Sequence, residues 1–411
     1  MNVYDNSLYL EDVNYVANLN LPWEKLNNKF IMISGATGLI GSMLVDIIMR
    51  KNNDNLNCTV YALGRSEERM RNRFKYCFEN PLFHFVEYDV NRKLCFTEDV
   101  TVDYILHLAS NTHPMQYSTD PIGTITTNII GVQNLLDFAV EHHTTRFAFA
   151  SSNEVYGENR GDVEKFDEKY CGYIDCNTMR AGYPESKRCG EALCQAYKAQ
   201  KGLDIVIPRL TRSYGPTLLK TDTKALSQFL HKGVAGEDIV LKSAGTQFYS
   251  YLYVMDSVSG LLTVLLNGES GEAYNISDDA SDIMLKDLAA IIADYAGKKV
   301  VFEIPDAVES AGYSKATKAR LDSSKLNSLG WKAKYDIKTG IVRTMEMLSN
   351  KLIAERSFMN LKETFKKQGG IKLLKQYWQG GALFTGIGQF LLLGKSRTAL
   401  EILRLSTTLK T

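Results

Sequence analysis

The sequence has few histidines and no excess of charge of either sign. Its 411 residues include 6 histidines, and 48 Lys and Arg against 47 Asp and Glu give a formal net charge of +1. A chain so close to neutral has no overall electrostatic preference for nucleic acid or for an anionic membrane surface. We therefore expect a small-molecule ligand and no nucleic-acid partner.

Disulfide and zinc patterns are also missing. The 7 cysteines are an odd number, form no Cys-x-x-Cys pair and have no clustered histidines beside them. This pattern is typical of reduced thiols, not of a disulfide framework or a structural zinc site. Cys171 lies near Cys176 and Cys189 near Cys194, but their surroundings supply no further ligands, so we expect no metal.

Long apolar runs are absent as well. The most apolar late stretch, residues 381–394, is interrupted by glycines, and it is shorter than the roughly 20 residues that a membrane-spanning helix needs. Residues 1–16 begin acidic and lack the basic start and apolar run of a secretory signal. These features predict no integral membrane segment and a cytoplasmic protein.

What the sequence does contain, from Lys29 onward, is a repeated alternation of strand and helix patterns. Amphipathic stretches such as residues 131–142 alternate with short runs that are apolar on both faces, which is typical of a parallel sheet covered by helices. The predicted fold is α/β, a Rossmann-type doubly wound parallel sheet, with strands in residues 29–34, 58–66, 83–90, 102–110, 146–152 and 203–210.

The composition changes along the chain and predicts four parts. We expect an N-terminal extension over residues 1–28 and a dinucleotide-binding Rossmann domain over 29–207. A smaller substrate-binding domain is expected over 208–347, with some segments returning to the first domain. Residues 348–411 have the pattern of basic amphipathic helices and predict a helical tail, for which packing on the body is favoured over dimerisation or contact with a partner.

The segment GATGLIG has glycines at 35, 38 and 41, directly after a predicted strand and at the start of a predicted helix. Such glycines let backbone amides approach a pyrophosphate, and the helix N-terminus favours its charge. This context favours a dinucleotide site over a purely structural turn. The predicted cofactor contacts here are Gly35, Thr37, Gly38, Leu39, Ile40 and Gly41.

The segment RAGYPESKR places Tyr183 and Lys187 four residues apart. Residues at this spacing lie on one face of a helix, and a cation beside a phenol lowers the pKa of the phenol. On this segment alone, a solvated charged face that also carries Glu185 and Arg188 is the simpler interpretation.

Five motifs taken together change that interpretation. With GATGLIG, HLAS, SSNEVYG, YPESK and RSYGP in this order, residues 29–347 resemble the extended short-chain dehydrogenase/reductase family, in particular its NAD-dependent epimerase/dehydratase group. The resemblance implies that Tyr183 is the catalytic acid/base and that Lys187 assists it and holds the nicotinamide ribose. It also implies that Ser152, rather than Ser151, hydrogen-bonds the reacting oxygen.

The resemblance implies an NAD(P) cofactor whose specificity depends on the end of the second strand. An Asp or Glu there bonds the ribose 2′-OH, whereas an Arg suits a 2′-phosphate. This chain has Gly64 and Arg65, which favours NADP(H) over NAD(H), with Arg65 on a solvated loop as the alternative. Asp89 matches the family's adenine-contacting acid, with a turn aspartate as the alternative. The other implied contacts are Val90, Leu108, Ala109 and Ser110.

The residues after Ser152 bear on the reaction. Asn153 and Glu154 align with Asp-Glu in sugar-nucleotide 4,6-dehydratases and with Ser-Glu in UDP-glucuronate decarboxylases. Asparagine cannot protonate a leaving hydroxyl, which weakens the dehydratase interpretation. Glu154 stays available as a base or to orient the substrate, with a structural turn carboxylate as the alternative. The surroundings of YPESK resemble the decarboxylase branch most.

Two positions depart from the family pattern. The family usually has Asn where this chain has Arg212 and Arg where it has Tyr249, and both positions help hold the substrate diphosphate. Either Arg212 has taken over the phosphate contact, or the substrate differs from the usual nucleotide hexose.

The resulting prediction is an NAD(P)-dependent enzyme that modifies a nucleotide sugar through a keto-sugar intermediate, as an epimerase, dehydratase or decarboxylase in capsule or polysaccharide precursor synthesis. The resemblance also implies a homodimer. One alternative is an NADPH-dependent reductase of a sugar phosphate or a nucleotide-activated polyol. A second alternative is a non-catalytic binding protein on the same fold, although the presence of Ser152, Tyr183 and Lys187 together counts against it.

Overall fold

A computed structural model describes residues 3–96, 100–112, 114–303 and 317–349. Apart from residues 348 and 349, the predicted C-terminal tail lies outside the described residues. All the described residues belong to one compact unit, and the division into domains at residue 207 stays a prediction.

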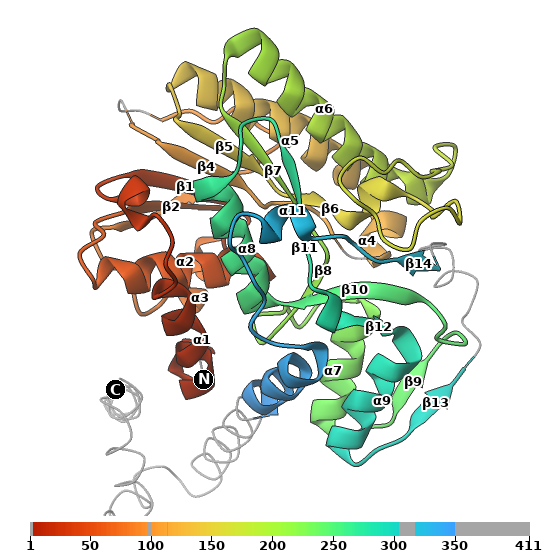
Figure 1. The fold of residues 1–411 in the computed structure, drawn as a ribbon. Helices are drawn as coiled ribbons and strands as arrows, with labels where there is room; N and C mark the ends of the chain where they lie inside the picture. Colours follow the sequence, from red (N-terminus) through yellow and green to blue (C-terminus); the bar gives the residue numbers. More distant parts are fainter. Residues whose placement is uncertain (1–2, 97–99, 113, 304–316, 350–411) are drawn as a thin grey trace, which may run out of the picture. The chain divides into compact units, whose positions relative to one another are not determined.

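A parallel sheet forms the centre of the fold (Figure 1), with strand order β11-β7-β5-β4-β1-β2-β3 and with β6 paired to β7. All of its strand pairs are parallel. The Rossmann-type architecture predicted from the strand and helix alternation is therefore confirmed. The strands are β1 (Phe30–Ser34), β2 (Thr59–Gly64), β3 (Phe83–Glu87), β4 (Tyr104–His107), β5 (Arg146–Phe149), β6 (Ser151–Ser152), β7 (Ile205–Leu210) and β11 (Ala273–Ile276).

Helices pack on both faces of this sheet because its strands are apolar on both faces. One apolar cluster joins the sheet to α2 (Leu39–Asn52) and α8 (Val254–Asn267). A second cluster joins the other face to α5 (Pro121–Glu141) and α6 (Gly182–Lys201), which lie side by side in Figure 1. Along the chain, the short helix α3 (Glu67–Arg73) lies between β2 and β3, and the short helix α4 (Pro114–Thr119) lies between β4 and α5.

A smaller set of elements follows β7 (Figure 1). Strand β10 pairs in parallel with β8 and β14 and antiparallel with β12, and β9 pairs with β13. Its elements are β8 (Arg212–Tyr214), α7 (Ala225–Ala235), β9 (Ile239–Leu241), β10 (Phe248–Tyr253), β12 (Asp282–Met284), α9 (Leu285–Ala296), β13 (Val300–Phe302) and β14 (Lys318–Ala319). Helix α11 (Ser324–Asn327) packs instead against β11 and α8. The chain returns from the smaller set to the main sheet through β11.

Helix α1 (Ser7–Ala17) is anchored by a buried carboxylate. Asp12 is fully buried, accepts a hydrogen bond of 2.5 Å from the Tyr253 hydroxyl, and pairs with Arg343 at 2.8 Å. Tyr253 ends β10, and Arg343 lies in the helical residues 337–349. The N-terminal segment is thus tied to two parts of the chain that lie far from it in sequence.

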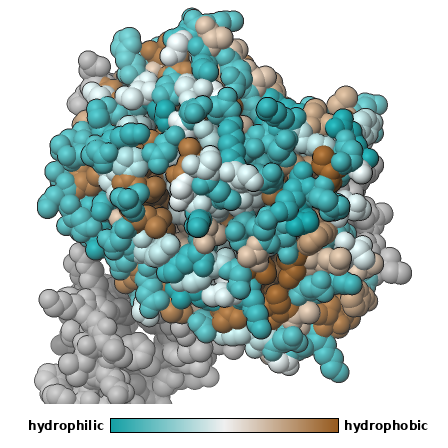
Figure 2. Space-filling model, in the orientation of Figure 1, coloured by the Kyte–Doolittle hydropathy of each residue, from teal (hydrophilic) through white to brown (hydrophobic). Residues whose placement is uncertain are grey.

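Hydrophilic residues cover most of the face seen in Figure 2, and hydrophobic residues form small separate groups on it. Among the described helices, none combines the length and the apolar character that crossing a bilayer requires.

Candidate active site

A cleft of about 620 Å³ opens at the carboxyl ends of the parallel strands. Ligands of open α/β sheets usually bind at this edge. The cleft is lined by the glycine turn after β1, by the start of α6, and by residues of the smaller set of elements. The predicted site residues that line it are Gly35, Gly38, Leu39, Ile40, Gly41, Leu108, Ser110, Ser152, Asn153, Glu154, Tyr183, Lys187, Arg212 and Tyr249, whereas Thr37, Arg65, Asp89, Val90 and Ala109 lie outside it.

The glycine turn fits a dinucleotide because two of its residues have no room for a side chain. Gly35 has a φ of +71°, and a Cβ there would lie 2.8 Å from the backbone N of Ala109. A Cβ on Gly41 would lie 2.4 Å from the carbonyl oxygen of Gly35. Helix α2 therefore begins directly against the turn, and the N–H groups of its first turn are available to a pyrophosphate.

The end of β4 is tied to the end of β1. The Ser34 hydroxyl hydrogen-bonds with His107 Nδ1 at 2.8 Å and accepts bonds of 3.2 Å from the backbone N–H groups of Leu108 and Ala109. Leu108 is thereby placed in the wall of the cleft, and Ala109 backs the glycine turn.

Tyr183 and Lys187 lie one turn apart at the start of α6, and both are almost fully buried. Lys187 Nζ donates a hydrogen bond of 2.8 Å to the carbonyl oxygen of Ala150 and lies 6.0 Å from the centroid of the Tyr183 ring. Burial lowers the pKa of the Lys187 ammonium to about 7. The two side chains are not a solvated charged face.

The environment of Tyr183 acts on its acidity in both directions. Burial and the negative charge of Glu154 raise the pKa of the phenol. Hydrogen bonding to Ser152, the positive charge of Arg180 and hydrogen bonding to Ser110 lower it. The groups that favour the phenolate therefore come from three different segments of the chain.

The two neighbouring serines have different surroundings. The Ser151 hydroxyl donates to Glu191 at 2.5 Å, away from the phenol, whereas Ser152 hydrogen-bonds Tyr183 and also accepts a bond of 3.2 Å from the backbone N–H of Glu154. Of the two serines, Ser152 is therefore the one that lies beside the Tyr183 phenol, and its action on the reacting oxygen stays a prediction.

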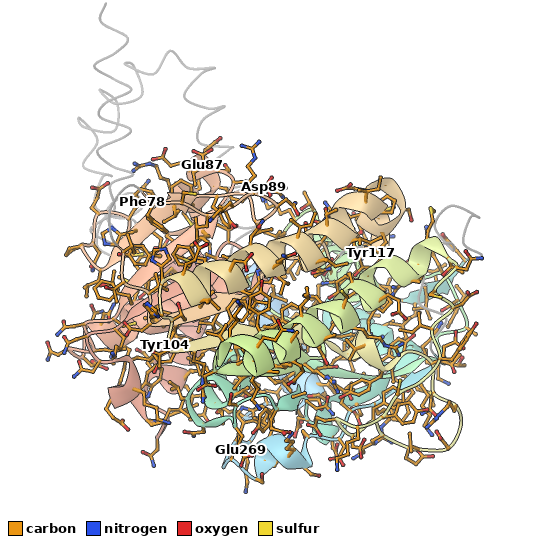
Figure 3. The ribbon with its side chains drawn as sticks, turned by 90° about the horizontal axis from the view of Figure 1, so that it is seen from above. Phe78, Glu87, Asp89, Tyr104, Tyr117 and Glu269 are labelled. Carbon is orange, nitrogen blue, oxygen red and sulfur yellow. The ribbon has the colours of Figure 1, made fainter. Side chains whose placement is uncertain are left out.

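Two residues of the site, Arg180 and Tyr117, were not singled out from the sequence. Arg180 Nη2 donates to both carboxylate oxygens of Glu154 at 2.7 Å, and its guanidinium lies 4.9 Å from the centroid of the Tyr117 ring. The ring of Tyr117, labelled in Figure 3, stacks on that of Tyr183 with centroids 5.1 Å apart. Arg180 stands only three residues before Tyr183, and this proximity was the one sequence signal for it.

A polar network joins α5 to α6 behind the phenol. The Ser110 hydroxyl donates to Asn128 Oδ1 at 2.9 Å, and Asn128 Nδ2 donates to Ser186 Oγ at 3.1 Å. Asn128 is fully buried. Sequence reasoning did not identify it, because nothing within α5 distinguishes this asparagine from an exposed one.

The two positions that depart from the family pattern lie against each other. The Arg212 guanidinium lies 3.7 Å from the centroid of the Tyr249 ring. Arg212 Nη1 and Arg180 Nε are buried and have no hydrogen-bond partner among the described residues. A second, smaller cleft of about 350 Å³ adjoins the first, and both are lined by Asn153, Glu154, Arg180 and Arg212.

The predicted adenosine contacts lie away from this chemistry. Arg65 is exposed directly after β2, and Asp89 follows β3 and accepts a hydrogen bond of 3.0 Å from the backbone N–H of Asn91. Figure 3 shows Glu87 and Asp89 at the same edge of the molecule, far from Tyr117. Val90 is buried against α5, where Asn134 Nδ2 donates to its carbonyl oxygen at 2.8 Å.

Comparison with known proteins agrees with this geometry. The model of the NAD dependent epimerase/dehydratase family matches residues 31–277. UDP-glucuronic acid decarboxylase 5 of Arabidopsis thaliana is 30% identical over 316 residues, which is 77% of this chain and 88% of the relative. UDP-glucuronic acid decarboxylase 1 of Danio rerio is 28% identical, over 79% of this chain and 74% of the relative.

Solved structures share the fold at lower identity. The dTDP-glucose 4,6-dehydratase of Streptomyces venezuelae, solved with NAD, superposes with a TM-score of 0.67 at 24% identity over 77% of this chain and 96% of that one. The UDP-glucuronic acid 4-epimerase of Bacillus cereus, solved with UDP-glucuronic acid and NAD, gives 0.66 at 20% identity over 78% and 99%. The chain belongs to the NAD dependent epimerase/dehydratase family.

Proposed function

We propose that this enzyme oxidises a nucleoside-diphosphate sugar acid at C4 and removes its C5 carboxylate, without net consumption of cofactor. The observation that carries the proposal is a pair of arginines, Arg180 and Arg212, which line the cleft together with Tyr183 and have buried N–H groups without a hydrogen-bond partner among the described residues. The names of the decarboxylase relatives support it. Its product would be a precursor for polysaccharide synthesis.

In this proposal Tyr183 accepts the proton of the C4 hydroxyl, and Ser152 hydrogen-bonds the same oxygen. Lys187 contributes its positive charge to the phenolate and holds the nicotinamide ribose. When bound, NAD(P) would supply the hydride acceptor for the oxidation at C4 and the hydride donor for the final reduction. Tyr183 gives its proton back to the C4 oxygen at the end of the cycle.

The C4 ketone makes the C5 carboxylate a β-keto acid, which loses carbon dioxide readily, and a proton then takes its place at C5. A carboxylate is a good partner for guanidinium groups that are already desolvated, because charge-assisted hydrogen bonds are the strongest available to it. Arg180 is close enough to Glu154 to share its charge between that side chain and the substrate. Asn153, which cannot act as an acid, disfavours loss of water.

The test uses the full chain with NAD and a panel of UDP-, CDP-, GDP- and dTDP-sugars, analysed by mass spectrometry. We expect a product lighter by one carbon dioxide from a sugar acid and no turnover in Tyr183→Phe. A product that has lost water, or an isomer of unchanged mass, would replace the proposal by dehydration or epimerisation. Stoichiometric consumption of NADPH would favour the reductase alternative.

Arg212 also serves to test which anionic group it binds. We expect Arg212→Asn to weaken substrate binding at least tenfold, since a hydrogen bond to a charged group contributes about 1.5–3 kcal/mol. Restoring the family pattern with Arg212→Asn and Tyr249→Arg together should recover part of the loss, because the two side chains touch.

Titrating UDP and a UDP-sugar acid into wild type, both single variants and the double variant separates the outcomes. If Arg212→Asn already weakens the binding of UDP, Arg212 binds the diphosphate. If it weakens only the binding of the UDP-sugar acid, Arg212 binds the carboxylate. Strict additivity of the two substitutions would mean that the positions share no ligand, and a smaller phosphorylated substrate would then be favoured.

We also propose a homodimer formed through α5 and α6. Ile122 on α5 is 75% exposed and Met179, just before α6, is 62% exposed, although both are apolar. Ile122→Asp should yield a monomer in sedimentation velocity. The matched control is Phe302→Asp, which places the same charge at an exposed apolar position on β13. A wild-type monomer, or dissociation by both variants alike, would contradict this interface.

A further inference from the structure

Helix α6 contacts the strand beside it through three side chains spaced one turn apart. Tyr183, Lys187 and Glu191 lie on one face of the helix. They contact Ser152, Ala150 and Ser151, respectively, which are three successive residues of one segment. The first two contacts belong to the site proposed above, whereas Glu191 lies behind it and does not line either cleft.

We infer that Glu191 is a positioning residue of the active site: it holds segment 150–152 in register with α6 and supplies the counter-charge that keeps the Lys187 ammonium beside the phenol. The inference rests on the proposed roles of Tyr183 and Lys187.

Both oxygens of Glu191 are occupied. Its Oε1 accepts hydrogen bonds from Ser151 Oγ at 2.5 Å and from Arg209 Nε at 2.9 Å, and its Oε2 accepts one from Arg209 Nη2 at 2.6 Å. The exposed fractions of the two charged side chains are only 14% and 12%. A carboxylate held on both sides in this way has a fixed position, which a solvated ion pair would not have.

The partners of Glu191 lie on two neighbouring strands. Ser151 of β6 and Arg209 of β7 stand opposite each other in the parallel pairing of these strands. Arg209 is itself held from behind, because its Nη1 donates to the Tyr156 hydroxyl at 2.9 Å and to the carbonyl oxygen of Glu168 at 2.7 Å. Glu191 therefore fixes the position of α6 relative to two strands, and with it the height of Tyr183 above Ser152.

Glu191 also acts on Lys187 through its charge. It is the main group that raises the pKa of the Lys187 ammonium against the effect of burial. In the described part of the chain, the other titratable groups facing Lys187 are Tyr183, the Cys194 thiol, whose pKa burial raises, and His107, whose pKa burial lowers to about 3. Near neutral pH the thiol and the imidazole are uncharged, so the negative charge on this side of Lys187 comes from Glu191.

The test is Glu191→Gln, which keeps the size of the side chain and removes the charge. Without the carboxylate, Lys187 lies near the positive charge of Arg209, which no longer has its ion-pair partner. Both pKa values of the coupled pair formed by Tyr183 and Lys187 should therefore be lower. We expect the whole pH–rate profile to move to lower pH, by about 0.5–1 unit, and its maximum to fall about three- to tenfold.

Three further variants separate charge from packing. Ser151→Ala removes one hydrogen bond and keeps the charge, so it should lower the maximum slightly and leave the profile in place. Glu191→Asp should also leave the profile in place, with a lower maximum. Glu185→Gln is the matched control on α6, since Glu185 pairs with Arg188 at 3.2 Å, and it should change neither quantity.

A readout that needs no substrate keeps this test independent of the proposed reaction. The titration of Tyr183 in the NAD-bound enzyme is followed as the phenolate absorbance that disappears in Tyr183→Phe. We expect Glu191→Gln to move this titration to lower pH. If folded Glu191→Gln shows the same Tyr183 titration and the same pH–rate profile as wild type, the inference is overturned, even if the enzyme turns over the sugar acid. If wild type shows no turnover but the Tyr183 titration moves in Glu191→Gln, only the proposed reaction is overturned.

Discussion

The chemistry of the site depends on how burial acts on two side chains of opposite type. Burial lowers the pKa of Lys187 to about 7 and raises that of Tyr183, so both effects oppose the pair of phenolate and ammonium on which the proposed mechanism depends. Ser152, Arg180 and Ser110 oppose the effect on the phenol. If Tyr183 and Lys187 act as proposed, these neighbours are needed as well as the two residues of the motif.

At this scale, Tyr183→Phe should lower hydride transfer by about 10²-fold or more, the usual contribution of a general acid/base group. Cofactor affinity should stay within a few-fold, because the phenol supplies chemistry and little binding. Single-turnover reduction of bound NAD measures the first quantity, and a fluorescence titration with NADH measures the second. Near-normal turnover would remove Tyr183 from the mechanism.

We expect the preference for NADP(H) or NAD(H) to depend on Arg65. Arg65 is exposed beside the end of β2, and its side chain forms no hydrogen bond or ion pair with another described residue. If it pairs with a 2′-phosphate, Arg65→Ala should weaken NADP(H) binding by about 1.5–3 kcal/mol and affect NAD(H) much less. Calorimetric titration of both cofactors into both proteins provides the comparison. Equal losses for the two cofactors would assign the site to NAD(H) without a 2′-phosphate contact.

At the scale of elements, the position of α6 depends on a glycine. A Cβ at Gly190 would lie 2.5 Å from Cζ and 2.9 Å from Cε1 of Phe149, a fully buried ring on β5. Gly190 therefore allows the helix to approach the sheet closely enough for Lys187 to reach the carbonyl oxygen of Ala150. The same glycine lies one residue before Glu191.

Gly190→Ala should consequently move α6 away from the sheet. We expect a loss of about 1–3 kcal/mol in the free energy of unfolding, as for other overpacked cores, and a fall in kcat beyond what the unfolded fraction explains. Cys189→Ala, at the neighbouring position on the helix, is the control. Urea unfolding and kcat are measured on the same samples. Lower stability together with full activity of the folded enzyme would contradict the prediction.

At the scale of the whole molecule, the buried ammonium of Lys187 affects the pH dependence of stability. The folded-state pKa of about 7 lies below the unfolded value of 10.5, so the unfolded chain binds more protons between these limits. This group therefore destabilises the folded protein at neutral pH. The destabilisation decreases as the pH rises from 7 towards 10.5, by up to about 1.4 kcal/mol in the free energy of unfolding per pH unit.

Lys187→Met should accordingly be more stable than wild type at pH 7, and the difference between the two proteins should shrink as the pH rises to 9. Urea unfolding of both proteins at a series of pH values measures this difference, from which the other titrating groups cancel. A difference that does not vary with pH would show that Lys187 has an ordinary pKa in the folded protein.

The parts of the protein that depend on short stretches of chain were predictable from its sequence. The alternation of strands and helices, the glycine turn at Gly35–Gly41 and the spacing of Tyr183 and Lys187 each involve residues within about one element. Their physical basis is local, since backbone conformation and side-chain periodicity act between near neighbours. The family followed from these motifs and their order.

The tertiary structure decided which side chains meet across elements. In the folded protein Ser151 hydrogen-bonds Glu191, whereas Ser152 lies beside the Tyr183 phenol. Glu154 pairs with Arg180, and Arg212 stacks on the Tyr249 ring. The tertiary structure also tied Asp12 to Tyr253 and Arg343, more than two hundred positions away. Such contacts are not encoded in any local pattern, because they exist only after burial and strand pairing have brought distant segments together and removed the water that would otherwise satisfy their charges.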